Sequence, residues 1–161
     1  MSPDDEDIDR AIQTMRTMQR SLYPTVLDHL GLDAAIDDLV KDFQERSGIA
    51  CNLEMEGEPF ELETAKRQAV YRIVQEALTN VMRHAEASEV DIILRREGPR
   101  LQVEIRDDGQ GMDPAAEKQT DSYGLTGMRK RAEICGGSLT IRTEPGGGTV
   151  VTVEVPLDAT A

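Results

Sequence analysis

The sequence predicts an α+β domain that follows a helical segment. Its 161 residues are about the size of one ordinary domain with a helical extension. Apolar residues alternate with polar ones in several short stretches, which indicates strands, and recur every three or four residues between them, which indicates helices. Strands and helices mixed along one chain of this length favour a single core, and that core must be aliphatic because aromatic residues make up only 3% of the chain.

The charge of the chain argues against several classes of function. With 31 acidic and 18 basic side chains the net charge is −13, whereas nucleic-acid binders present a basic surface, so we expect no direct nucleic-acid binding. No stretch approaches the roughly 18–20 apolar residues of a membrane helix, and the acidic first residues differ from the basic start of a signal peptide. The two cysteines, Cys51 and Cys135, lack the spacing of metal ligands. We therefore expect a cytoplasmic protein.

Two helices are expected before the first strand. Residues 5–30 carry a narrow apolar seam at alternating spacings of three and four, which is typical of helices that pack in bundles or coiled coils. Pro24 is expected to kink or break this helix because it lacks the backbone N–H that the turn needs, and Gly31 is expected to end it. A second helix is predicted over Ala34–Arg46, with Asp33 as its N-cap.

The other elements follow from alternation, helical spacing and turn residues. The longest helical pattern runs from Thr64 to Ala85, and a shorter one from Leu125 to Cys135 ends at two glycines. Residues 108–124 are polar and lack periodicity, and a loop of that length inside a domain is usually functional or mobile. The predicted strands are Ile49–Glu56, Val90–Arg96, Leu101–Asp107, Ser138–Glu144 and Thr149–Pro156.

Glycines gather in the second half of the chain. Nine of the 13 follow residue 108, and seven of these form three clusters: Gly109 and Gly111, then Gly124 and Gly127, then residues 146–148. Any one cluster is typical of an ordinary turn, but glycine also lets the backbone approach a ligand closely. Three clusters in order, each after a strand or at a helix start, favour a ligand site.

The long helical pattern carries a polar stripe. Glu76, Asn80 and His84 are four residues apart, so they share one side of the helix at the margin of its apolar arc. Asn is a weak helix former, and a carboxylate with an amide oxygen suits Mg²⁺ when phosphate oxygens complete the shell. The stripe by itself also fits an ordinary amphipathic boundary.

Four motifs resemble those of the ATP-binding domain of histidine kinases. Residues 76–85 (EALTNVMRHA) resemble its N box, residues 107–112 (DDGQGM) its DxGxG box, residues 124–131 (GLTGMRKR) its glycine box, and residues 146–149 (GGGT) its final element. Their order and spacing match over roughly residues 33–157. The resemblance implies the Bergerat-type fold that DNA gyrase, a heat-shock chaperone and the mismatch-repair ATPases share: a mixed sheet of about five strands with helices on one face, here preceded by an N-terminal helix.

The resemblance implies that ATP and Mg²⁺ are the ligands. Asp107 would accept a hydrogen bond from the amine of adenine, with Thr149 completing the recognition. Gly109 and Gly111 would keep the backbone clear of the base. The family's pattern also places Met112 among the nucleotide-binding residues.

The phosphate end of the implied site lies on two helices. Asn80 would hold Mg²⁺, while Arg83 and His84 would neutralise phosphate charge. Glu76 would act as a base or orient the nucleophile, which makes Glu76 and Asn80 the catalytic candidates. The start of a further helix would receive phosphate oxygens on its backbone N–H groups, at Gly124, Leu125 and Gly127.

A narrower resemblance concerns residues 22–36 (LYPTVLDHLGLDAAI). They are similar to the junction in sensor kinases of the nitrate/nitrite- and lipid-sensing type, where the second helix of the dimerisation hairpin enters the catalytic domain. We therefore expect residues 1–31 to be part of that hairpin and residues 32–161 to be the catalytic domain. The resemblance implies a homodimeric full-length protein, the cytosolic part of a membrane-anchored bacterial sensor, and a response regulator with a helix-turn-helix output domain as partner.

The sequence departs from that family in two places. The family's acceptor histidine is followed by an acidic residue, whereas His29 is followed by Leu30, so we expect His29 to be a surface or packing residue and the acceptor helix to lie outside this chain. Asp108 replaces an asparagine that many relatives carry, and we expect its charge to weaken nucleotide binding slightly. Three alternatives stay open: a stand-alone serine kinase that inhibits a sigma factor, another ATPase of the superfamily, and a nucleotide-independent interaction module.

Overall fold

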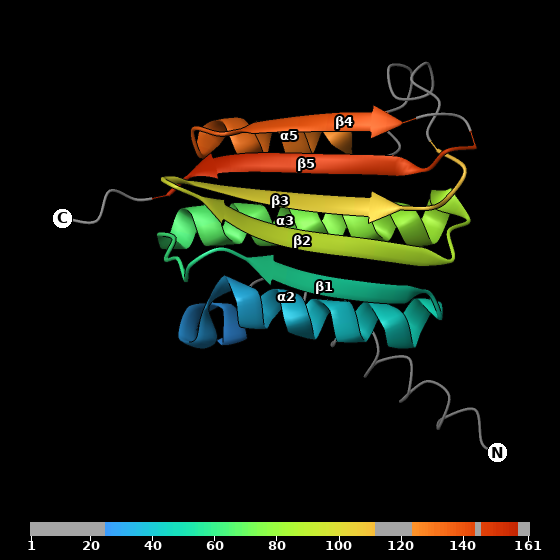
Figure 1. Cartoon of the computed structure of the whole chain (residues 1–161), viewed down its shortest axis with the longest axis horizontal. Coiled ribbons are helices and arrows are strands. Elements are labelled where there is room, and N and C mark those ends of the chain that lie inside the picture. The colour runs from blue at the N-terminus through green and yellow to red at the C-terminus, as the bar shows by residue number, and fades with distance from the viewer. Residues whose placement is uncertain (1–24, 112–123, 144–145, 158–161) are drawn as a thin grey trace, which may run out of the picture.

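The computed structural model describes the backbone of residues 25–111, 124–143 and 146–157 (Figure 1). Residues 5–24 of the expected first helix, Pro24 among them, and residues 112–123 of the long polar loop therefore lie outside the described residues. Among the helices that are described, none is both long enough and apolar enough to cross a membrane.

Five strands in the described part form one mixed sheet. Its spatial order is β1-β2-β3-β5-β4, with β1 parallel to β2 and every other neighbouring pair antiparallel. Helices α3 and α5 lie behind the sheet in Figure 1, and α2 lies along its β1 side. This confirms the expected α+β fold. The elements are α2 (Thr25–Ser47), β1 (Ala50–Glu56), α3 (Thr64–Asn80), η1 (Val81–Ala85), β2 (Glu89–Glu97), β3 (Arg100–Asp107), α5 (Leu125–Ile134), β4 (Ser138–Thr143) and β5 (Thr149–Pro156).

The core lies between the sheet and the helices. Alternate residues of the central strands are buried and aliphatic, as period-two patterning requires when only one face of a sheet is covered. The largest fully buried side chains combine strand residues with residues of α2, α3 and α5: Ile36, Val70, Ile73, Val74, Val90, Ile92, Leu94, Leu101, Val103, Leu125 and Met128. A ligand site on the covered face must therefore sit at an end of this core.

The opposite face of the sheet is polar. A chain of side-chain hydrogen bonds crosses four strands: Arg95 donates to Glu56 (2.7 Å) and to Gln102 (3.2 Å), and Gln102 donates to Glu154 (3.1 Å). Cross-strand pairs of this kind stabilise a sheet surface without burying it. The predicted site residues at the ends of β3 and β5 belong to the other face.

Helix α2 contains the break that the sequence predicts at Gly31. The backbone there is non-helical (φ 89°, ψ 178°), so α2 consists of two helical pieces. A positive φ is costly for a residue with a Cβ, which explains the glycine. Beyond the break, Leu32, Ile36 and Phe43 are buried against the sheet and α3.

The last turn of the long helix differs from the sequence prediction. A regular α-helix was expected over Thr64–Ala85, but α3 ends at Asn80 and Val81–Ala85 form a π-helical turn, after which Glu86 adopts a left-handed conformation (φ 51°). The wider turn still leaves Val81 buried, so the spacing of apolar residues does not distinguish the two geometries. Single π-turns of this kind are frequent at functional sites.

Candidate functional site

Three polar residues are buried in the described part of the chain: Asn80, Asp107 and Thr149, which are 8%, 9% and 5% exposed. Burying polar groups costs free energy unless they are paired, so a protein rarely retains them without a reason. All three are residues that the motifs single out. They come from the end of α3, the end of β3 and the start of β5.

Asp107 and Thr149 are direct cross-strand partners. Asp107 ends β3, and Thr149 opens β5 opposite it in the antiparallel register. Asp107 continues the buried alternation of Val103 and Ile105, so its side chain faces the helices. The hydroxyl of Thr149 lies 3.2 Å from the hydroxyl of Thr143 on β4. This hydrogen bond orients the Thr149 side chain. The two groups predicted to recognise adenine thus share one edge of the core.

The carboxyl group of Asp107 is held in a defined orientation. The backbone N–H of Gly109 donates to its Oδ1 at 2.8 Å. Burial raises the pKa of Asp107 above its ordinary value, hydrogen bonds from the backbone of Gly109 and Thr149 oppose this, and the charge of Asp108 adds to the increase. The Asp107 carboxyl group is therefore a hydrogen-bond acceptor that is partly shielded from water.

The turn before β5 is pressed against the end of β3. A Cβ on Gly148 would collide with the carbonyl oxygen of Asp107, and Gly148 also has a φ of +80°, so only glycine fits. The N–H of Gly146 donates to the carbonyl of Gln110 at 2.7 Å. The last glycine cluster thus positions Asp107 directly.

Gln110 joins this turn to the π-helical turn. Its side-chain amide donates to the backbone carbonyl of His84, while its own carbonyl accepts from Gly146. Three motifs that are distant in sequence therefore meet at Gln110. Sequence reasoning did not single out this residue, because a variable position inside a glycine motif gives no signal.

Asn80 supplies an amide side chain to the same region. It is the last residue of α3, one turn beyond Glu76 and one turn before His84. Among the described residues, no group of three or more His, Cys, Asp or Glu side chains could hold a metal ion. One amide oxygen suits Mg²⁺ nevertheless, because this ion usually takes only one or two protein ligands and completes its shell with water and phosphate. The donor set therefore fits a magnesium ion that arrives with a nucleotide.

The start of α5 offers backbone donors. Gly124 is its N-cap in a left-handed conformation (φ 66°, ψ 22°), without a side-chain cap. The first N–H groups of a helix have no partner within it, and groups of this kind suit an anion. Leu125 is 1% exposed and belongs to the core, so the predicted contact with nucleotide is restricted to its backbone.

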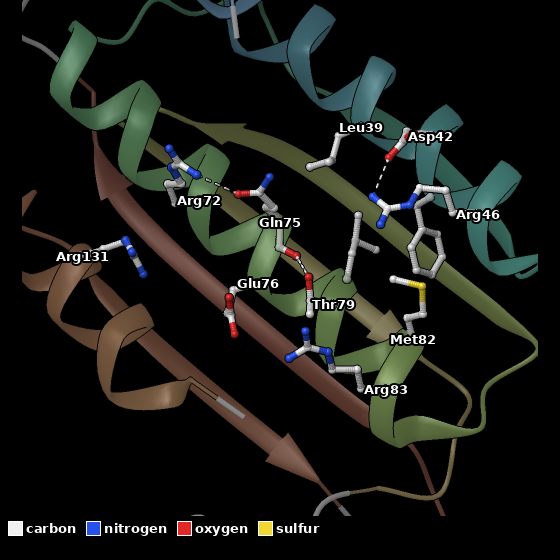
Figure 2. Close-up of a pocket in the computed structure, with 12 residues that line it drawn as sticks. Leu39, Asp42, Arg46, Arg72, Gln75, Glu76, Thr79, Met82, Arg83 and Arg131 are labelled. Carbon is white, nitrogen blue, oxygen red and sulfur yellow. Dashed lines mark hydrogen bonds and ion pairs between the residues drawn. The ribbon is translucent and has the colours of Figure 1, made fainter. Parts of the chain in front are cut away.

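Glu76 and Arg83 line a cavity of about 380 Å³ between α2, α3 and α5 (Figure 2). A Cβ on Gly124 would come within 2.5 Å of Glu76 Oε1, so the N box and the glycine box touch here. Asn80, Asp107 and Thr149 do not line this cavity. The predicted residues thus form two neighbouring groups, one at the strand ends and one on the outer side of α3.

Asp108 does not face the site. Its carboxylate accepts hydrogen bonds from Ser88 N (2.8 Å), Ser88 Oγ (2.6 Å) and Glu89 N (3.0 Å) at the start of β2. These bonds, with that of the Ser88 hydroxyl first, lower the pKa of Asp108. The expectation that its charge weakens nucleotide binding stays a prediction: the carboxylate is bonded to the start of β2, while its charge still raises the pKa of Asp107. Met112 and the side chain of His29 lie outside the described residues.

Comparison of the sequence with known protein families shows which family the chain matches. Residues 65–159 match the family described as histidine kinase-, DNA gyrase B-, and HSP90-like ATPase. The chain is 32% identical over 167 residues to the signal transduction histidine-protein kinase/phosphatase DegS of Brevibacillus brevis. That alignment covers 95% of this chain but 43% of DegS, so the chain spans less than half of the length of this relative.

Solved structures agree at the level of the fold. The histidine kinase domain of a blue-light activated histidine kinase from Erythrobacter litoralis EL346 has a TM-score of 0.63 at 22% identity, covering 78% of this chain and 65% of that one. The histidine kinase AdeS of Acinetobacter baumannii has a TM-score of 0.67 at 11% identity, covering 99% and 88%. At these identities the likeness establishes the architecture alone.

Proposed function

Because the chain belongs to the family of histidine kinase-, DNA gyrase B-, and HSP90-like ATPases, we propose that it is the ATP-binding catalytic domain of a two-component sensor histidine kinase. In this role it binds Mg-ATP and presents the terminal phosphate to a histidine on a hairpin helix. The similarity to DegS, itself a histidine-protein kinase, favours this member of the family over the others.

The burial of Asn80, Asp107 and Thr149 is the observation that carries this proposal. The three residues supply an amide oxygen, a carboxylate and a hydroxyl at one end of an otherwise aliphatic core. A carboxylate is an acceptor without a donor of its own when ionised, so Asp107 selects a base that presents an amine. Adenine does so at the position where guanine presents a carbonyl.

The other residues serve the phosphates and the space around the base. Arg83 and His84, in the basic last turn of the π-helix, counter the phosphate charge. The backbone N–H groups after Gly124 donate hydrogen bonds to phosphate oxygens, and Gly109 and Gly111 leave room for the base. Met112 completes the set as the family's pattern implies.

Asn80 is the proposed protein ligand of Mg²⁺, and the ion would supply positive charge that neutralises the phosphates. Glu76, against the glycine turn, orients the incoming nucleophile or takes its proton. Phosphoryl transfer of this kind depends mainly on positioning and on stabilising charge, and the proposed site supplies both from buried Asn80, half-buried Glu76 and His84, and exposed Arg83.

The proposal extends to the parent protein. Residues 1–31 correspond to part of the dimerisation hairpin and residues 32–161 to the catalytic domain, because the junction motif spans the break at Gly31. In the same proposal, the parent protein contains the acceptor helix and a membrane anchor and assembles as a homodimer. It belongs to the nitrate/nitrite-type subfamily, and its partner is a response regulator of the helix-turn-helix output type. The catalytic portion is cytoplasmic in this arrangement.

Calorimetric titration of the chain with Mg-ATP tests the binding step, and a radiolabelled transfer assay tests the chemistry. We expect ATP to bind and the chain alone to remain unlabelled by its γ-phosphate. Acid-labile, alkali-stable label should appear on an added peptide that carries the family's acceptor helix. Label on serine of an added protein would instead support an anti-sigma-factor kinase, and the absence of nucleotide binding would overturn both.

A further inference from the structure

Gln110 connects the end of β3 to the π-helical turn. Its backbone carbonyl accepts a hydrogen bond from the N–H of Gly146 at 2.7 Å, and its side-chain amide donates to the backbone carbonyl of His84. The ends of β3 and α3 lie at the same end of the sheet (Figure 1). The backbone of Gln110 therefore belongs to the strand end that carries Asp107, while its side chain reaches the turn that continues α3.

Apolar packing does not select the geometry of the π-helical turn. Val81 is buried in this turn and would also be buried in an α-helix, and Arg83 is exposed. A π-turn contains more residues than an α-turn, so it changes the directions in which the side chains of its later residues leave the helix. Contacts other than apolar burial are needed to fix those directions.

The residue after the turn shows that this geometry is costly. Glu86 has a φ of 51°, and in the described part of the chain it is the one residue other than glycine with a positive φ. A side chain in the left-handed region is strained by its Cβ, and such a residue persists where its surroundings hold it in place. The Glu86 side chain is exposed, so its own burial does not offset the strain.

The side chain of Gln110 supplies a contact that holds the turn. The last carbonyl groups of a helix have no partner within the helix, and the Gln110 amide bonds to the carbonyl two residues before Glu86. The other end of the connection is fixed as well, because the Gly109 N–H bonds to the Asp107 carboxylate and Gly148 packs against the Asp107 carbonyl. Gln110 thus sets the position of the turn relative to Asp107.

We infer that Gln110 is a positioning residue for nucleotide binding, which holds Arg83 and His84 in the direction of the phosphates while the base lies at Asp107. This rests on the proposed function, which assigns those residues to the two parts of the nucleotide. A site that is already ordered at both places binds a ligand that spans them without an ordering cost. Gln110 therefore favours ligands with phosphates over the nucleoside alone.

The ratio of ADP affinity to adenosine affinity, measured by NMR titration of the whole chain in excess Mg²⁺, tests this inference. Gln110→Met keeps the length of the side chain and adds no charge, but it cannot donate to the His84 carbonyl. The ratio should fall by about fivefold, the size expected for one hydrogen bond, and adenosine affinity should stay nearly unchanged. A merely structural role would lower both affinities together.

Gln102→Met is the matched control. The Gln102 amide donates to Glu154 at 3.1 Å on the open face of the sheet, so this variant loses a similar hydrogen bond away from the site. Its ratio should equal that of the wild type.

A second substitution at Glu86 tests whether Gln110 acts through the turn. In the Gln110→Met background, Glu86→Gly relieves the strain of the positive φ and should recover part of the lost ratio. Glu86→Gln removes the same charge without relieving the backbone, so it should recover less.

An unchanged ratio in Gln110→Met, or equal recovery by Glu86→Gly and Glu86→Gln, would overturn the inference. A wild-type chain that binds neither ADP nor adenosine would instead contradict the proposed function. Because the ratio compares two ligands on one preparation, partial misfolding of a variant does not change it.

Discussion

The side chain of Glu76 occupies the space in which a side chain on Gly124 would begin. A Cβ built on Gly124 would lie 2.5 Å from Glu76 Oε1, and the φ of Gly124 is +66°. The polar stripe of α3 and the start of α5 therefore lie close together at a place where glycine leaves room for the Glu76 side chain.

Gly124→Ala should lower the free energy of unfolding by more than the roughly 1–2 kcal/mol of a left-handed alanine, because the new Cβ also displaces the Glu76 carboxylate. Thermal and chemical unfolding measure this effect. Gly98→Ala gives the matched control: its φ is +59° and no atom lies within 4 Å of the added Cβ, so it reports the backbone cost alone.

Adding Glu76→Ala to Gly124→Ala should recover the part of the loss that exceeds the Gly98→Ala value, because the colliding carboxylate is gone. If Gly124→Ala and Gly98→Ala lower the free energy of unfolding by the same amount, the added Cβ at residue 124 does not disturb the Glu76 side chain, and the prediction is wrong.

Asp107 should determine base preference. ADP should stabilise the chain against heat far more than GDP at equal concentration, because guanine would place a carbonyl against an acceptor and leave buried polar groups unpaired. Asp107→Ala should remove most of the ADP effect. Asp107→Asn should be milder, since its amide oxygen still accepts while its NH₂ group can donate to guanine.

Asp108→Asn controls for the neighbouring charge. The Asp108 carboxylate is bonded to Ser88 and Glu89 on the other side of the strand, so this variant should keep adenine preference intact and change only the start of β2. A loss of preference in Asp108→Asn but not in Asp107→Ala would mean that the motif is out of register by one residue.

Adenine binding should weaken at low pH because of Asp107. Burial raises its pKa in the folded, empty protein, so the folded chain holds this proton more tightly than the unfolded chain. The stability contributed by this group is therefore present below the ordinary carboxyl pKa and is lost as pH rises through the raised value. Adenine needs the ionised acceptor, so ADP affinity should fall as pH drops through the raised pKa.

Comparison of ADP affinity in the wild type and in Asp107→Asn, from neutral pH to about pH 4.5, isolates this effect, because titration of the nucleotide is common to both. The wild type should lose affinity more steeply than the variant. Parallel profiles would show that Asp107 does not change its charge on binding.

Most of the fold could be predicted from the sequence because each element carries its own periodic signal. The alternation of Leu101, Val103 and Ile105 predicts a half-covered strand, and the same alternation brings Asp107 to the covered face. The break occurs at Gly31 because glycine adopts a positive φ without the steric cost that other residues have. The margin of the apolar arc predicts that Asn80 is partly shielded from water, and the motif resemblance predicts that Asp107 and Thr149 belong to one site.

The remaining features depend on tertiary contacts that local sequence does not encode. The π-helical turn at Val81–Ala85 buries the same apolar residues as an α-helix would, and Gln110, which bonds to it, stands at a position without a pattern. The hydrogen bonds of Asp108 to Ser88 become visible only when β2 and β3 are paired. The contribution of Leu125 to the core likewise requires knowledge of the face on which α5 packs.

Asn80 should carry the dependence of nucleotide affinity on Mg²⁺. Because Asn80 is 8% exposed and stands at the end of α3, Asn80→Ala is expected to cost some stability as well. The ratio of ADP affinity in excess Mg²⁺ to that in excess chelator separates the two effects, since a folding defect alters both terms. Removal of one oxygen from a metal that requires near-octahedral geometry should bring this ratio towards one.

Asn80→Asp retains an oxygen ligand and should keep a ratio well above that of Asn80→Ala, although its added negative charge will oppose the phosphates when the metal is absent. Gln75→Ala is the control on the same helix, because Gln75 lines the outer cavity and not the buried group. Its ratio should match the wild type. If Asn80→Ala keeps the wild-type ratio, magnesium is held by other groups, and Asn80 is buried for its hydrogen bonds at the end of α3 rather than for the metal.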